Sequence, residues 1–169
     1  MQGVTPLSLQ GLHYGMGHRL APGDLAPSFK KPSTDGTTDL DALRGQWVVL
    51  YFYPRDFTPG CTVETCDFRD LRQEIDATVV GVSPDPVESH EKFRTEHGLP
   101  FPLISDGDNT LAKAYGAWGE KKNYGRTYEG LIRSTFIIDP EGCIAEAMYN
   151  VKAAGHGARV SNRLAALRV

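Results

Sequence analysis

The strongest constraint on the fold is a run of seven consecutive apolar residues, Trp47 to Tyr53, which reads Trp-Val-Val-Leu-Tyr-Phe-Tyr. β-Branched and aromatic side chains favour a β-strand. Because no residue in the run is charged or strongly polar, both faces of that strand must be covered. The run is also far shorter than the roughly 20 residues that a membrane-spanning helix needs. We therefore predict the central strand of a sheet with packed layers on both sides, and no transmembrane helix.

A turn, a helix, a second strand and a second helix follow this run. The turn, Pro54 to Gly60, contains two prolines and a glycine, and Val63 to Ile75 then places apolar side chains at helical spacing. A buried strand is predicted at Thr78 to Ser83, followed by a helix at about Val87 to His97 that Gly98 ends. A strand, helix and strand of these lengths imply parallel strands joined by a right-handed crossover.

The second half of the chain changes from this parallel pattern to an antiparallel one. A short extended piece and a capped helix lead into two strands joined by a turn, and an amphipathic helix closes the chain. The extended piece is predicted at Phe101 to Ser105 and the two strands at Ile132 to Ile138 and Cys143 to Tyr149. The capped helix is predicted to run from Asp108 or Asn109, as its cap, to Tyr115, and the last helix from about Ala158 to Leu167. This outline indicates an α/β fold of the thioredoxin-like type, with a central mixed β-sheet flanked by helices.

Length and charge exclude several classes of protein. A chain of 169 residues is about one domain, which we place at residues 23–169, after an extension of unassigned order at residues 1–22. Its 18 Lys and Arg against 21 Asp and Glu leave no excess of positive charge for nucleic acid or an anionic membrane. Met1 to Gly23 lacks the basic and continuous apolar regions of a secretory signal. We therefore expect a cytoplasmic protein, whose thiols serve metals or redox chemistry, with no nucleic-acid or membrane partner.

Cys61 occupies a position that favours a reactive thiol. It follows a buried strand and a tight turn, at or just inside the first turn of a helix, where the positive end of the helix dipole favours a thiolate. That end contributes only about 0.3–1 kcal/mol, so a nearby cation and a hydroxyl donor would also be needed. Thr58 and Arg133 are candidates for these two groups. The alternatives are that Thr58 is a turn residue and Arg133 a surface charge.

Cys66 cannot form a disulfide with Cys61 within an intact helix. Five positions along an ideal helix separate two Cα atoms by about 8.7 Å, with the side chains on nearly opposite faces. A disulfide requires Cα atoms within about 7 Å. A static structural bond is therefore disfavoured, whereas a switching pair remains open, in which Cys61 is oxidised and Cys66 traps the sulfenic acid after the helix unwinds.

A zinc site is disfavoured. The spacing C-x4-C and the pair His13 and His18 fall near zinc-ligand spacings, but zinc-binding cysteines normally come from knuckles rather than from one continuous amphipathic helix. We expect the remaining histidines to be solvated and the third cysteine to be an incidental thiol; these residues are His90, His97, His156 and Cys143.

The residues around Cys61 resemble a known family. The run Tyr51-Phe-Tyr-Pro-Arg-Asp-Phe-Thr-Pro-Gly-Cys-Thr-Val-Glu-Thr-Cys66 contains P-x-x-x-T-x-x-C and is similar to the peroxiredoxins. The cysteine five places further on makes it resemble the bacterioferritin-comigratory-protein or Q-type subfamily. Gly23 to Phe29, Trp118 to Gly130 and Arg133 to Phe136 also resemble segments of that family. Only Met1 to about Leu20 falls outside the resemblance.

The resemblance implies a function and roles for five residues. Cys61 would be the peroxidatic cysteine and Cys66 the resolving one, while Thr58 and Arg133 would hold the peroxide and Pro54 would shield the sulfur. The expected enzyme is an atypical 2-Cys peroxidase that reduces hydrogen peroxide and organic hydroperoxides and is recycled by thioredoxin or a glutaredoxin. The resemblance implies no metal, haem or flavin cofactor, and a monomer is favoured over a dimer.

Two other functions remain open at this point. A general thiol-disulfide oxidoreductase would share the fold, but that chemistry typically uses C-x-x-C, whereas this chain has C-x4-C. A redox sensor or binding module would be oxidised once and passed to a partner.

The sequence departs from the family at Phe57, where many relatives carry a small or polar residue.

Overall fold

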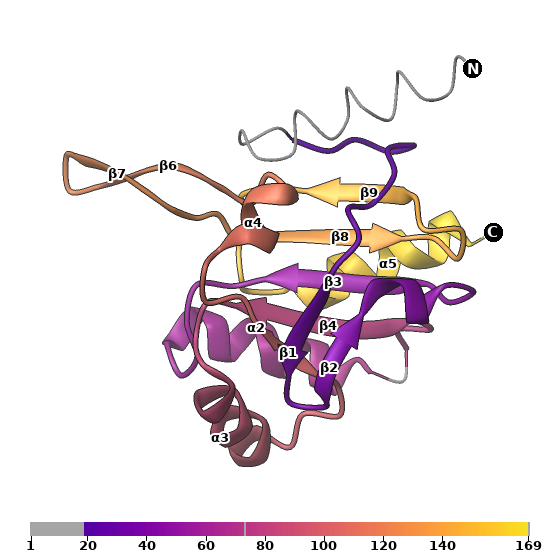
Figure 1. The fold of residues 1–169 in the computed structure, drawn as a ribbon, viewed down its shortest axis with the longest axis horizontal. Helices are drawn as coiled ribbons and strands as arrows, with labels where there is room; N and C mark the ends of the chain where they lie inside the picture. The colour runs from indigo at the N-terminus through magenta and orange to yellow at the C-terminus, as the bar shows by residue number, and fades with distance from the viewer. Residues whose placement is uncertain (1–18, 73, 169) are drawn as a thin grey trace.

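The apolar run forms strand β3 (Val48–Phe52), which lies in the interior of a seven-stranded sheet (Figure 1). All five of its residues are buried, as the absence of polar positions predicts. On one side β3 pairs in parallel with β4 (Thr78–Ser83), and on the other it pairs antiparallel with β8 (Ser134–Ile138). The structure is a computed structural model that describes residues 19–72 and 74–168.

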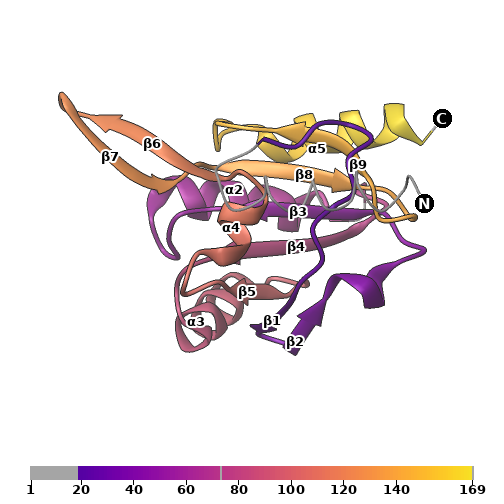
Figure 2. The same ribbon diagram turned by 45° about the horizontal axis from the view of Figure 1, so that its top comes forward.

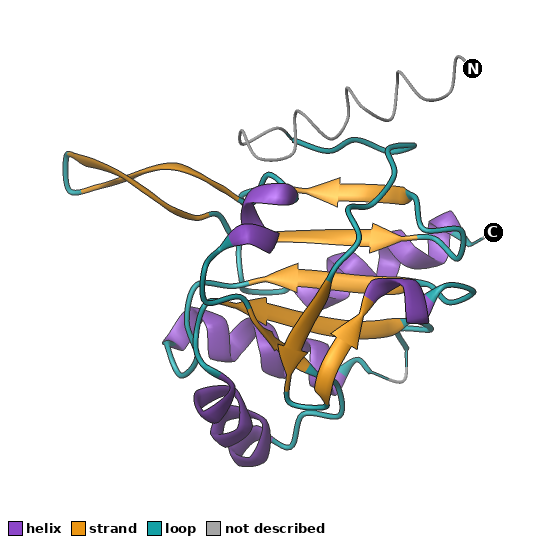
Figure 3. Cartoon of the chain, viewed as in Figure 1, coloured by secondary structure: helices purple, strands orange, loops and turns teal. Residues whose placement is uncertain are grey.

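The full sheet has the strand order β2-β1-β5-β4-β3-β8-β9. The strands β3, β4 and β5 are parallel to one another, and the remaining pairings are antiparallel. The strands not yet given are β1 (Lys30–Ser33), β2 (Gly36–Asp39), β5 (Leu103–Ser105) and β9 (Ile144–Met148). The predicted thioredoxin-like arrangement, a mixed sheet flanked by helices, is therefore confirmed (Figure 3).

Helices cover both faces of this sheet (Figures 1 and 2). Side chains alternate along β3, so that Val49 and Tyr51 join one apolar cluster and Leu50 and Phe52 join the other. The first cluster lies under α2, α3 and α5, and the second under α4 and the 3-10 helix η1. These helices are α2 (Pro59–Asp70), α3 (Val87–His97), α4 (Thr110–Ala114), α5 (His156–Leu167) and η1 (Leu40–Leu43).

A two-stranded arm leaves the body of the molecule (Figures 1 and 2). It consists of β6 (Trp118–Asn123) and β7 (Arg126–Leu131), which pair only with each other. Tyr124, at the turn, is 98% exposed. The sequence did not predict these strands, because both faces of the arm are largely exposed and no apolar alternation marks them.

One predicted helix boundary and one predicted cap need correction, and one hairpin was missed. Helix α2 begins at Pro59 rather than Val63, because proline is well suited to the first helical position. At α4, Asn109 is the N-cap residue but makes no side-chain cap. The Asp108 carboxylate, the other predicted cap, accepts a hydrogen bond from the backbone N–H of Thr110 at 3.2 Å, and the buried Asp106 carboxylate accepts from those of Leu111 and Ala112. The hairpin of β1 and β2 was also not predicted.

Most of the predicted extension, residues 1–22, lies outside the described residues. Leu20 within it is 4% exposed, and its backbone N–H donates to the Tyr149 hydroxyl at 2.7 Å. Among the residues that the structure describes, no helix is long and apolar enough to cross a membrane.

Candidate active site

Cys61 lies in the first turn of α2, where the sequence places it. Thr58 is the N-cap residue and Pro59 the first helical residue, so Cys61 is the third residue of the helix. Its side chain packs into the apolar cluster beneath α2 and is 1% exposed. The thiol is therefore nearly dry and close to the positive end of the helix dipole, which favours its anion.

Arg133 reaches Cys61 because of the register between two strands. β8 pairs with β3 so that Ser134 lies opposite Phe52, and this register brings Arg133, just before β8, to the end of β3 from which α2 begins. Its Nη2 donates to Cys61 Sγ at 3.3 Å. The guanidinium is thus positioned to stabilise negative charge on the sulfur.

Glu64 is a third member of this site that sequence reasoning missed. Its side chain is fully buried, and Oε1 accepts a hydrogen bond from Nη1 of Arg133. Oε2 has no hydrogen-bond partner among the described residues. Burial raises the pKa of this carboxyl to about 7, although Arg133 opposes the shift. The available signal was the spacing of three residues from Cys61, which places both side chains on one side of the helix.

Replacing Glu64 by Gln is expected to change how stability depends on pH. Its pKa is about 7 in the folded protein against 4.5 for an ordinary glutamate, so the native state binds a proton on Glu64 that the unfolded chain lacks within this window. The contribution of Glu64 to the free energy of unfolding therefore falls as the pH rises through this window, by up to about 3 kcal/mol. Gln does not titrate, so the free energy of unfolding of Glu64→Gln should rise relative to that of the wild type between about pH 5 and pH 8.

Urea unfolding of both proteins at about pH 5 and pH 8 measures this effect. Comparing the two proteins at each pH removes the contributions of all other titrating groups. Glu74→Gln, at an exposed position, is the matched control and should show no such change. A stability difference between Glu64→Gln and wild type that stays the same at both pH values would contradict the prediction.

Two other predicted site residues, Thr58 and Pro54, make no hydrogen bond to the thiol within the described part of the chain. The Thr58 hydroxyl donates to the backbone carbonyl of Arg55 at 3.0 Å rather than to Cys61. Pro54 and Arg133 line an open pocket of about 420 Å³, together with Lys121 and Lys122 of the arm. Arg133 therefore borders the pocket and contacts the thiol.

Cys66 lies in the same uninterrupted helix as Cys61, and both are free thiols. Cys66 Sγ is 3.7 Å from Nδ1 of His97, at the end of α3. The prediction that His97 is solvated is therefore wrong: its side chain is only 21% exposed and contacts a cysteine on the neighbouring helix.

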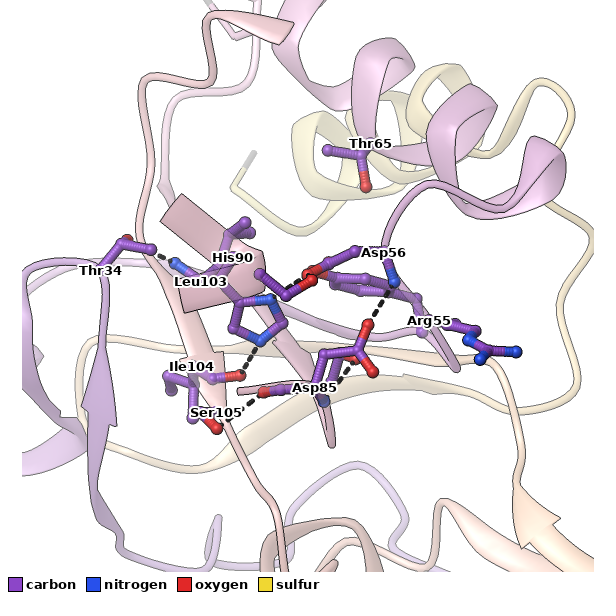
Figure 4. Close-up of polar contacts among 12 residues, drawn as sticks. Thr34, Arg55, Asp56, Thr65, Asp85, His90, Leu103, Ile104 and Ser105 are labelled. Atoms are coloured by element: carbon purple, nitrogen blue, oxygen red, sulfur yellow. Dashed lines mark hydrogen bonds and ion pairs between the residues drawn. The ribbon is translucent and has the colours of Figure 1, made fainter. Parts of the chain in front are cut away.

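The turn between β3 and α2 is held by a buried polar cluster (Figure 4). Asp56 Oδ1 accepts from the Tyr53 hydroxyl at 2.6 Å, and Oδ2 contacts His90 Nδ1 at 2.6 Å and the Ser89 hydroxyl at 2.8 Å. The Asp56 backbone N–H donates to Asp85 Oδ2 at 2.7 Å. We call Tyr53, Asp56, Asp85, Ser89 and His90 the turn anchor. It ties the loop before Cys61 to α3 and to the end of β4.

His90 was also predicted to be solvated, and it is fully buried instead. Its Nε2 contacts the carbonyl oxygen of Ile104 at 3.0 Å, and its Nδ1 contacts the Asp56 carboxylate (Figure 4). Both of those oxygens are hydrogen-bond acceptors. Asp56 and His90 therefore form a buried, hydrogen-bonded pair.

The remaining candidates make no hydrogen bond to Cys61 among the described residues. His156 was predicted to be solvated but is buried, and its Nε2 is 2.8 Å from the Thr135 hydroxyl; burial lowers its pKa to about 4. Cys143 is partly buried at the start of β9, where its backbone N–H donates to Asp139. Within residues 19–72 and 74–168, no three His, Cys, Asp or Glu side chains are grouped so that they could hold a metal ion.

Comparison with known sequences matches the chain to one family. The sequence pattern of the AhpC/TSA family matches residues 22–147. Peroxiredoxin Bcp of Bacillus subtilis is 45% identical over 146 residues, which are 84% of this chain and 93% of that protein. Peroxiredoxin Bcp of Escherichia coli is 40% identical over 149 residues, which are 86% of this chain and 96% of that protein.

Comparison with solved structures agrees. The bacterioferritin comigratory protein of Xanthomonas campestris, described for its alkyl peroxide reduction activity, is 44% identical and superposes with a TM-score of 0.77, over 82% of this chain and 90% of that one. A cysteine-to-serine mutant of PrxQ from Xylella fastidiosa is 38% identical with a TM-score of 0.82, over 90% of this chain and 99% of that one.

Proposed function

Because the chain belongs to the AhpC/TSA family and, within it, to the Bcp/PrxQ peroxiredoxins, we propose that it reduces hydroperoxides through Cys61, with Cys66 as the resolving cysteine. The observation that carries this proposal is the buried Cys61 thiol in the first turn of α2, 3.3 Å from the Arg133 guanidinium. The cation and the helix N-terminus favour a nucleophilic thiolate, and they act against the burial of the sulfur, which favours the neutral thiol.

In the first step, the Cys61 thiolate attacks the terminal oxygen of the hydroperoxide. The S–O bond forms, the O–O bond breaks, and the other oxygen leaves as water or an alcohol after taking up a proton. Negative charge grows on that leaving oxygen, and donors already in position stabilise such charge by about 3–4 kcal/mol each in analogous sites. Arg133 has the charge and the position to be that donor.

Pro54 and Thr58 have supporting roles in this proposal. Pro54 borders the pocket beside Arg133 and limits the access of water to the sulfur. The Thr58 hydroxyl now donates to Arg55, and a rotation about its side chain would let it donate to a bound peroxide instead. Substrate binding would thus exchange one hydrogen bond of Thr58 for another.

In the second step, Cys66 attacks the Cys61 sulfenic acid. The S–S bond forms, the S–O bond breaks, and hydroxide leaves and becomes water after protonation. Since both residues lie in one intact helix, at an ideal Cα separation of about 8.7 Å, the first turns of α2 must unwind first. The resulting disulfide would be reduced by a dithiol protein, thioredoxin or a glutaredoxin.

Organic hydroperoxides are proposed as substrates beside hydrogen peroxide. The related Xanthomonas protein is described as reducing alkyl peroxides, and the pocket of about 420 Å³ beside Arg133 gives room for an organic group. We further propose that the protein acts as a monomer, with no cofactor other than its two thiols.

Mass spectrometry after one equivalent of peroxide tests the assignment of the two cysteines. The wild type should show the Cys61 and Cys66 peptides joined by a disulfide. Cys66→Ser should instead accumulate one added oxygen on Cys61, which a sulfenic-acid reagent would trap, because no neighbouring thiol can condense with it. Cys143→Ser is the matched control and should behave as the wild type.

Oxidation that begins at Cys66 or Cys143, or a disulfide that includes Cys143, would contradict the assignment. Sustained consumption of NADPH with thioredoxin, thioredoxin reductase and peroxide is also expected. A single oxidation without turnover would instead support a redox sensor, and disulfide exchange without peroxide consumption would support a general oxidoreductase.

A further inference from the structure

We propose that His97 is the proton acceptor that converts Cys66 into the thiolate needed to attack the Cys61 sulfenic acid. The inference rests on the proposed role of Cys66 as the resolving cysteine and adds a catalytic residue to the second step. Its basis is the contact of 3.7 Å between Cys66 Sγ on α2 and His97 Nδ1 on α3. Among the described residues, this imidazole is the hydrogen-bond partner of the Cys66 thiol.

The neighbours of His97 set which ring nitrogen is free to accept a proton. Its Nε2 lies 3.5 Å from Oε2 of Glu96. A carboxylate oxygen is an acceptor, so this neighbour favours the tautomer with the hydrogen on Nε2, in which the lone pair of Nδ1 is available to the sulfur. Cys66, His97 and Glu96 thus form a nucleophile, a base and a group that orients the base, which is the arrangement that activates nucleophiles in many enzymes.

Packing and backbone contacts fix the imidazole at this position. The Phe93 ring lies edge-on at 5.0 Å, and the Phe57 ring lies at 6.5 Å. Phe57 reaches this cluster from a left-handed backbone conformation with φ of 66°, an uncommon one for a bulky residue. The carbonyl of His97 accepts a hydrogen bond from Nη1 of Arg69 at 2.7 Å, which joins the end of α3 to α2. The residue that departs from the family pattern therefore packs against the proposed base.

The chemistry of the second step requires such a base. The thiolate is the attacking species, whereas an ordinary cysteine thiol is only about 3% ionised at pH 7. Cys66 would pass its proton to His97 Nδ1, and its sulfur would then bond to Cys61 as hydroxide leaves. The imidazolium returns the proton to that hydroxide, directly or through solvent, so that one water is released and His97 is restored.

Charged groups of both helices lie around this contact. Arg69 lies three residues from Cys66 on α2, close enough for its charge to interact with the sulfur, and its Nε donates to Asp70 at 2.9 Å. Glu96 lies next to His97 on α3. Thiolate formation would precede unwinding, because the contact between Cys66 and His97 exists in the folded helix.

The test measures the two steps separately in the full-length protein by rapid mixing with hydrogen peroxide and quenching. His97→Phe keeps an aromatic ring for Phe93 to pack against but removes the base. Sulfenic acid formation on Cys61 should proceed at the wild-type rate. Disulfide formation at about pH 7 should slow by about 10- to 30-fold, because full ionisation raises the thiolate fraction by no more than about 30-fold. The difference should disappear by about pH 10, where the thiol ionises without help.

Two further variants separate proton transfer from packing. Added imidazole should restore a substantial part of the disulfide formation rate in His97→Gly, whereas it should not affect the wild type. Glu96→Gln should slow disulfide formation by a few-fold, since the group that orients the base is weakened. Glu91→Gln is the matched control, because it removes an exposed carboxylate from the same helix, and should leave both steps unchanged.

The outcomes distinguish this inference from the function on which it rests. Wild-type disulfide formation in His97→Phe would overturn the inference, as would a slowing that is the same at every pH and not relieved by imidazole. If Cys66→Ser still forms a disulfide on Cys61 at the wild-type rate, with Cys143 or with a second chain, the role of Cys66 fails instead. If Cys66 is required and His97 is not, only the inference about His97 fails.

Discussion

The Arg133→Met variant should reduce peroxide at least about 10²- to 10³-fold more slowly than the wild type. Removing one donor that stabilises a developing oxyanion costs about this much in other enzymes. Here the guanidinium also faces the Cys61 sulfur at 3.3 Å, so its loss weakens the thiolate as well as the binding of the leaving oxygen. Stopped-flow measurement of the second-order rate constant with hydrogen peroxide is the direct test.

Two controls make this measurement specific. Arg133→Lys keeps one positive charge but lacks the planar fork with which the guanidinium contacts Glu64 and Cys61 at once, so its rate constant should fall between those of the wild type and Arg133→Met. Arg126→Met removes an exposed arginine from the arm and should leave the rate constant unchanged. Circular dichroism establishes that each variant is folded. A near-normal rate constant in folded Arg133→Met would rule out the assigned role.

The Asp56→Asn variant should lose about 3–5 kcal/mol of the free energy of unfolding. Each buried donor that loses its acceptor costs about 1–3 kcal/mol, and more where the acceptor is charged, because the donor stays buried without a partner. Asp56 and His90 are both fully buried in their side chains, and Asn cannot accept the three hydrogen bonds that the Asp56 carboxylate accepts in the turn anchor. Urea unfolding followed by circular dichroism measures the loss.

A surface ion pair provides the matched comparison. Asp35 pairs with Arg94 at 2.7 Å, with side chains that are 51% and 29% exposed, so Asp35→Asn should cost less than about 1 kcal/mol. The double variant Asp56→Asn with His90→Gln should be more stable than the sum of the two single losses predicts, because the second change removes the unpaired group. If Asp35→Asn and Asp56→Asn lose the same free energy of unfolding, then Asp56 in the turn anchor contributes no more to stability than a surface ion pair.

Local patterns in the sequence predicted the elements that depend on near neighbours. The strands at Thr78 to Ser83 and around Val49, and the helix Val87–His97, were predicted closely, because a mostly apolar run marks a strand covered on both faces and Pro and Gly mark the ends of a helix. The arm and the hairpin of β1 and β2 were missed because exposed strands carry no such pattern. β1 also contains Pro32, which argues against a strand.

The predictions that His90 and His97 are solvated were wrong for a related reason. His90 and His97 lie on a helix rich in charge, and from sequence alone such a helix indicates a solvated face. Both are in fact covered by residues distant in the chain: Asp56 is 34 positions from His90, and Cys66 is 31 positions from His97. No local pattern contains those pairings.

The sequence by itself determined that a cysteine follows a buried strand and a Pro/Gly turn at the start of a helix, that a second cysteine lies five residues further on, and which family this spacing resembles. Only the tertiary structure decided which groups surround the two sulfurs. Arg133 is 72 positions from Cys61 and arrives through the register of β8 on β3, while His97 reaches Cys66 through the packing of α3 beside α2. The physical reason is that helix and strand periods are set within a few residues, whereas strand register and helix packing are set by burial summed over the whole core.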